Sequence, residues 1–145
     1  MHYVDSTLSR ALIKLHTRPT IQDIDNLSHY LAGLYDSAKR SEGLSLLKDA
    51  CQRHPIAEVF LEDPYVRRAF EKPRGYAGDA VMLDYIYRPG RLDASSLGRA
   101  IHAATTGLPN AKSILWRRDY LARQIRAVAE RGGVARILSV ASGHM

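Results

Sequence analysis

The sequence contains one cysteine, Cys51, and no apolar run near the length of a transmembrane helix. A single cysteine excludes a disulfide within the chain, and no CxxC partner surrounds it, so we expect a buried structural thiol. A bilayer-spanning helix needs about 20 apolar residues, which no segment supplies. The first residues also lack the apolar core of a secretory signal. We therefore expect a cytoplasmic protein without a membrane span.

Long runs of one charge are also missing, although the chain is basic. Its 21 lysines and arginines exceed its 15 aspartates and glutamates, which gives a formal net charge of +6. Such an excess is typical of proteins that bind nucleic acids or anionic substrates. The basic residues are scattered, however, with pairs such as Arg117-Arg118 as the densest groups. This scatter favours a solvated basic surface and argues against a nucleic-acid partner.

Apolar residues recur every three or four positions along most of the chain, which predicts a succession of amphipathic helices. The longest should run from about 110 to 130. The expected N-caps are Asp5 or Ser6, Thr20, Asp63, Asp79 and Asp93. Several aromatic residues are expected in the core rather than in a cofactor site, namely Tyr30, Tyr35, Tyr85, Tyr87 and Trp116. We predict a mainly α fold, with a helical N-terminal cap domain over residues 1–130.

The chain changes character after residue 130. Residues 137–140 (ILSV) form a short apolar run, and Gly143 follows in a loop of small residues. A helix, a glycine turn and an apolar strand that ends in a glycine-bearing loop are how a doubly wound α/β unit begins. Because a lone strand is not stable, we predict that residues 131–145 are the start of a Rossmann-like core whose remainder is missing.

A polar loop, residues 72–79 (KPRGYAGD), interrupts the helical pattern in mid-chain. Gly75 and Gly78 permit a positive φ or close backbone approach. Arg74 has the planar donor geometry that suits a carboxylate, and Tyr76 adds an aromatic face and a hydroxyl. These groups complement the carboxylate, the adenosine and the charges of a cofactor such as S-adenosylmethionine.

The same loop also suits a purely structural turn between two helices. In that interpretation Asp79 caps the following helix, and Arg74 pairs on the surface with Glu71 or with Asp79. The glycines then only shape the turn. Composition alone favours this structural interpretation, because short motifs often mislead.

A resemblance reverses that preference. The stretch from Glu71 to Tyr87 (EKPRGYAGDAVMLDYIY) resembles a segment ahead of the catalytic core in a bacterial family of class I S-adenosylmethionine-dependent methyltransferases, which includes the enzyme that makes a quorum-sensing ester from a 3-hydroxy fatty acid. Residues 137–145 are similar to the first motif of that core, although Ser139, Ala141 and Met145 depart from its usual acid and glycines. The resemblance covers about His54 to Met145.

The resemblance implies a helical cap over a methyltransferase active site, with S-adenosylmethionine as the cofactor and no metal. The implied cofactor-binding residues are Arg74, Gly75, Tyr76, Gly78, Asp79, Ala141 and Gly143. Asp79 stays undecided between helix cap and ligand contact. His144 either orients or deprotonates an acceptor near neutral pH or simply packs in its loop, and the other histidines show no metal-like spacing. His54, before Pro55, is expected to have a capping or core role.

Two functions remain in competition. The first is the N-terminal portion of a methyltransferase that modifies oxygen on a small acidic or hydroxylated acceptor, such as a fatty-acid carboxylate. The second is a non-catalytic helical module that binds a protein or nucleic acid through a basic surface. The apolar run at 137–140 and the polar loop favour the first, whereas arginines gathered on one face would favour the second. We expect the 145 residues alone to be inactive as an enzyme.

Overall fold

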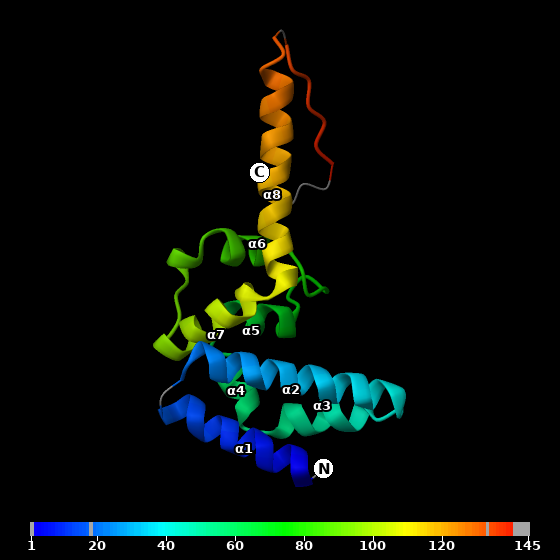
Figure 1. Cartoon of the computed structure of the whole chain (residues 1–145), viewed down its shortest axis with the longest axis vertical. Coiled ribbons are helices and arrows are strands. Elements are labelled where there is room, and N and C mark those ends of the chain that lie inside the picture. Colours follow the sequence, from blue (N-terminus) through cyan, green and yellow to red (C-terminus); the bar gives the residue numbers. More distant parts are fainter. Residues whose placement is uncertain (1, 18, 133, 141–145) are drawn as a thin grey trace.

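A computed structural model describes residues 2–17, 19–132 and 134–140 of the chain. Within these ranges the chain forms eight α-helices and one short 3-10 helix, and no β-strand (Figure 1). The elements are α1 (His2–Thr17), α2 (Ile21–Arg40), α3 (Leu44–Arg53), α4 (Ile56–Phe60), α5 (Pro64–Glu71), α6 (Ala80–Tyr87), η1 (Pro89–Arg91), α7 (Ser96–Gly107) and α8 (Pro109–Ala129). The predicted mainly α fold is confirmed.

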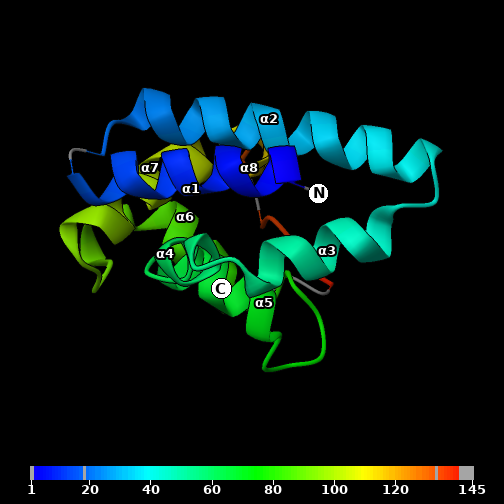
Figure 2. The ribbon, with the colours of Figure 1, turned by 90° about the horizontal axis from the view of Figure 1, so that it is seen from below.

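The first seven α-helices make one body, from which α8 projects (Figure 1). Helices α1 and α2 lie side by side, and α3 returns along α2 (Figure 2). Helix α7 is central to the body, because it contacts α2, α4, α5 and α8. Aliphatic side chains from α1, α2, α4 and α7 form the buried core: Leu8, Leu15, Ile24, Leu27, Ile56, Val59, Ile101 and Ala104.

Polar side chains cap several helices as the sequence predicts. The caps at Thr20, Asp63 and Asp79 are confirmed, because each side chain accepts a hydrogen bond from an amide in the first turn of its helix. Two other predicted caps are wrong. Helix α7 is capped by Ser95 rather than Asp93, and the Ser95 hydroxyl accepts from the Gly98 amide at 2.9 Å. Helix α1 already begins at His2, so Asp5 lies within its first turn.

The strand predicted at 137–140 is not formed. Residues 134–140 have no regular secondary structure, and the side chains of Leu138 and Val140 are 89% and 79% exposed. A strand needs a neighbouring strand to pair its backbone groups, and the described part of the chain offers none. The Rossmann-like core predicted for 131–145 therefore gains no support from the structure.

Helix α8 also differs from expectation, because its predicted apolar stripe is largely open to solvent. Leu121 is 58% exposed, and Tyr120, Ile125 and Val128 are exposed as well. Trp116 was expected in the core, yet it is 60% exposed. Tyr35 was also wrongly placed in the core, whereas Tyr30, Tyr85 and Tyr87 are half-buried.

Candidate functional site

The polar loop 72–79 links α5 to α6 and lies on the surface of the body. Lys72 ends α5 in the left-handed conformation, with a φ of 49°. The Gly75 amide then donates to the Lys72 carbonyl at 2.8 Å, and Gly75 itself has a φ of 83°. Gly78 does not have a positive φ, so the backbone requires a glycine at 75 and not at 78.

Asp79 fixes the far end of this loop. Its residue is 1% exposed, and its carboxylate accepts from the Met82 amide at 3.3 Å. The Arg68 guanidinium donates to both carboxylate oxygens, with Nε at 2.8 Å from Oδ1 and 3.0 Å from Oδ2. Arg74 adds a longer ion pair, with Nε 3.7 Å from Oδ2. The carboxylate is therefore an anchor that joins α5, the loop and α6.

The electrostatics of this anchor follow from its partners. Hydrogen bonds from Arg68 are the largest cause, and together with the Met82 amide and the charges of Arg68 and Arg74 they outweigh burial and lower the pKa of Asp79 to about 2. The same pairing raises the pKa of Arg68. Asp79 thus stays ionised at every pH at which the protein is expected to work, and the structure shows its capping role directly.

The remaining loop side chains are open to solvent. Arg74 has 56% of its side chain exposed, and Tyr76 is 55% exposed. Of the two surface pairings considered for Arg74, the one with Asp79 is observed, whereas Glu71 pairs with Arg67 at 3.8 Å. Tyr76 and the guanidinium edge of Arg74 are therefore accessible to a ligand that approaches from outside the body.

The structure brings five of the predicted site residues together in this loop: Arg74, Gly75, Tyr76, Gly78 and Asp79. The predicted residues Ala141, Gly143 and His144 lie outside the described residues. The predicted meeting of the two loops in one cofactor pocket therefore stays a prediction. Arg68 was not identified from the sequence as the main partner of Asp79. Ion pairs along a helix are recognised at spacings of three or four residues, whereas these two residues are eleven apart and lie on different helices.

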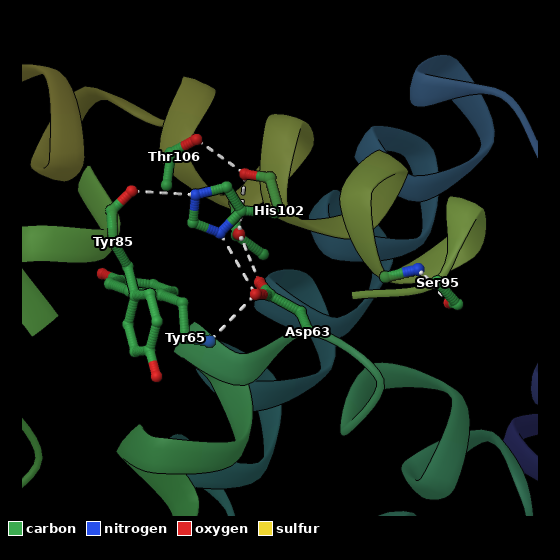
Figure 3. Close-up of polar contacts among 8 residues, drawn as sticks. Asp63, Tyr65, Tyr85, Ser95, His102 and Thr106 are labelled. Carbon is green, nitrogen blue, oxygen red and sulfur yellow. Dashed lines mark hydrogen bonds and ion pairs between the residues drawn. The ribbon is translucent and has the colours of Figure 1, made fainter. Parts of the chain in front are cut away.

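A second polar cluster is buried between α5, α6 and α7 (Figure 3). The Asp63 carboxylate accepts from the Tyr65 amide at 2.9 Å and from the Thr105 hydroxyl at 3.2 Å. His102 bridges two elements: its Nδ1 lies 3.1 Å from Asp63 Oδ1, and its Nε2 lies 3.1 Å from the Tyr85 carbonyl. Both ring nitrogens thus face oxygen atoms, so the ring links Asp63 to the end of α6.

This cluster holds the body together rather than presenting a reactive group. Asp63 and His102 have side chains that are 0% and 4% exposed, so a substrate cannot reach them. Their pairing fastens the start of α5 and the end of α6 to the middle of α7. Sequence reasoning missed the pair, because 39 residues separate its members.

Ser9, His54 and Asp5 are the residue types of a catalytic triad, but their hydrogen bonds do not allow its chemistry. The Nε2 atom of His54 lies 3.1 Å from the Ser9 hydroxyl and 3.9 Å from Asp5 Oδ1. The Ile56 amide donates to Nδ1 of the same ring at 3.1 Å. In the neutral ring, Nε2 therefore carries the hydrogen, so it cannot take a proton from Ser9. The capping or core role predicted for His54 is confirmed, because the residue is buried and stands at the C-cap of α3.

An apolar cleft of about 260 Å³ lies between α2, α3, α4 and α5. Its lining includes Leu31, Cys51, Phe60 and Phe70, one residue from each helix. Burial raises the pKa of the Cys51 thiol, which disfavours the thiolate and a nucleophilic role. Phe70 is the residue before Glu71, where α5 leads into the polar loop.

Comparisons of the chain with protein families, with curated proteins and with solved structures find no match. Across the described residues, no three histidine, cysteine, aspartate or glutamate side chains are grouped so that they could hold a metal ion. Of the helices in the same ranges, none has both the length and the apolarity needed to cross a bilayer.

Proposed function

We propose that the chain is the N-terminal helical portion of an S-adenosylmethionine-dependent methyltransferase, in which loop 72–79 covers part of the cofactor. The observation that carries the proposal is this loop: a specific sequence that resembles the methyltransferase family, with Arg74 and Tyr76 exposed and the end of the loop anchored by the buried Asp79 carboxylate. Such an anchor suits a cofactor site, because a loop that is already held in place loses less conformational entropy when the cofactor binds.

In this proposal each loop residue has a separate task. The Arg74 guanidinium pairs with the carboxylate of the cofactor, and the Tyr76 ring packs against its adenosine. Gly75 and Gly78 let the backbone approach. Asp79 is buried with both oxygens engaged, so we assign it to positioning the loop, and a direct ligand contact would require the loop to move.

The rest of the site would come from segments beyond the described residues. Ala141 and Gly143 would approach the cofactor at the end of a strand that forms only beside the other strands of a complete core, and His144 would orient the acceptor. Methyl transfer to an oxygen depends on alignment and exclusion of water more than on proton transfer. The acceptor is proposed to be small and acidic or hydroxylated, such as a fatty-acid carboxylate, and the apolar cleft at Phe70 supports an acceptor with an alkyl chain.

The test uses the complete protein and calorimetric titration with S-adenosylmethionine. Arg74→Ala should weaken binding roughly tenfold to a hundredfold, the worth of one hydrogen-bonded charge pair. Arg67→Ala is the matched control, because Arg67 is a similarly exposed arginine one helix turn before the loop. Unchanged affinity in the Arg74 variant would remove the loop from the cofactor site. Methyl transfer by the 145 residues alone would contradict the proposal that they are one portion of the enzyme.

A further inference from the structure

Helix α8 carries four side chains on one face, a pair of aromatic residues with one basic residue before it and one after it. They are Lys112, Trp116, Tyr120 and Arg123, at intervals of four, four and three residues, which places them along one side of a helix. We refer to these four residues as the basic-aromatic stripe. All four are exposed, and the stripe spans about 17 Å along the helix axis.

The two aromatic rings of the stripe pack on each other and stay exposed. The Trp116 and Tyr120 rings stack with centroids 5.1 Å apart and planes 14° apart. Trp116 is 60% exposed and Tyr120 is 41% exposed. The opposite side of α8 faces the body, because Ala111 is buried there and the Arg118 guanidinium lies 5.1 Å from the Tyr87 ring centroid of α6. The stripe therefore points away from the rest of the molecule.

The charge of the chain is concentrated on this same helix. Residues 109–129 contain five basic residues and one acidic residue, a net charge of +4, against +6 for the whole chain. Asp119, the acidic residue, pairs with Arg118 at 2.7 Å. The basic residues look scattered in the sequence, but the fold places most of their excess on one projecting element.

We propose that the basic-aromatic stripe binds single-stranded nucleic acid. The outer face of a stacked aromatic pair accepts a nucleotide base, since every base has a flat π-face, and flanking cations accept the phosphates. A second copy of this chain would bring one strongly positive helix against another. Helix α8 also exposes Leu121, Ile125 and Val128, so an anionic membrane surface is tested beside the oligonucleotide. This inference does not depend on the proposed methyltransferase function.

Trp116 is the single tryptophan of the chain, so tryptophan fluorescence reports directly on binding at the stripe. We would titrate the full chain with oligodeoxythymidylate of about 12 nucleotides, within the usual range for single-strand sites, and record the Trp116 emission. Saturable quenching is expected, together with an affinity that falls as salt is added. Inorganic polyphosphate and phosphatidylserine vesicles are the comparison ligands, because they supply anionic phosphate without bases.

Variants separate stacking from charge, with binding followed by the anisotropy of a labelled oligonucleotide. Tyr120→Ala should weaken binding roughly fivefold to a hundredfold and leave the salt dependence unchanged. Arg123→Ala should lower the slope of log affinity against log salt by about 0.7, the value for one phosphate contact on a single strand. Tyr35→Ala, which removes an exposed tyrosine from α2, is the matched control and should bind like the parent. Circular dichroism verifies that each variant is folded.

Three results would overturn the inference. The first is no saturable quenching at low salt. The second is equal quenching by polyphosphate, which would show that charge alone accounts for binding. The third is binding to the vesicles without binding to the oligonucleotide, which would assign the stripe to a membrane surface instead.

Discussion

Replacing Gly98 with alanine tests how closely α7 approaches the corner between α4 and α5. A Cβ at position 98 would lie 2.5 Å from the Glu62 carbonyl oxygen and 3.0 Å from its carbon. Close C···O contacts in proteins begin at about 3.3 Å, so the two backbones would have to separate by roughly 0.8 Å. A change of rotamer cannot relieve a clash with backbone atoms. His102 lies one turn further along α7, so the separation also pulls it from Asp63.

Two opposing effects determine how Gly98→Ala changes the free energy of unfolding. Alanine replaces glycine in a helix with a gain of up to about 1 kcal/mol, whereas a clash in a packed interior costs about 1–3 kcal/mol. Gly33 is the matched control, because it lies in the middle of α2 and a Cβ there meets nothing within 4 Å. Gly33→Ala should show the helix gain alone. The difference between the two variants isolates the contact at Glu62, and we expect about 1–3 kcal/mol.

The assay is thermal unfolding followed by circular dichroism, with urea unfolding as a second measure. For a chain of this size, the expected difference corresponds to melting temperatures that differ by roughly 3–10 °C, with Gly33→Ala the higher. Equal melting temperatures for the two variants would refute the reasoning. So would a Gly98→Ala variant that is more stable than the parent.

The remaining predictions concern the polar loop and the buried cluster. Gly75→Ala should lower the free energy of unfolding in urea by about 1–2 kcal/mol, because the φ of 83° at this position is unfavourable for an L-residue. Gly78→Ala should keep the parent midpoint, because a Cβ there meets nothing within 4 Å. Equal midpoints for the Gly75 and Gly78 variants would contradict this prediction. Asp63→Ala leaves the buried His102 ring without its hydrogen-bond partner and should cost about 1–3 kcal/mol in urea unfolding. A midpoint equal to that of the parent would count against the pair. The pKa of Asp79 is about 2 in the folded chain, below its ordinary 3.8, so its contribution to stability is complete above about pH 4 and is lost as the pH falls through about 2. Thermal melts across this window should therefore show less acid destabilisation in Asp79→Asn than in the parent, and identical profiles would disprove it.

Local signals in the sequence predicted the N-caps of α2, α5 and α6. A cap such as Thr20 acts on an amide three residues away, so the relevant atoms are neighbours in the chain. The start of α7 shows the limit of this reasoning. Asp93 and Ser95 are both good caps by type, and Ser95 is used because its hydroxyl also donates to the Glu62 carboxylate, a contact that the local pattern does not contain.

Contacts between distant residues account for what the sequence did not predict. The Asp63–His102 and Arg68–Asp79 pairs exist because α5, α6 and α7 meet, and periodicity reports only which face of a helix is apolar. The same limit explains α8, where the pattern predicted a buried stripe but could not say whether a partner covers it. The polar loop was recognised as a candidate site, yet its anchor was found only in the structure.

The early turns of α8 contact α6 and α7, whereas its later turns project from the body (Figure 1). The two ends of this one helix should therefore differ in their stability against local opening. Amides in the early turns should exchange with deuterium only when the body opens, whereas those beyond Leu121 lie in the part of α8 that projects from the body (Figure 1) and should exchange by local opening. Fraying should therefore advance from the Ala129 end while the body stays closed. The residue at which protection rises would mark the edge of the cooperatively folded unit.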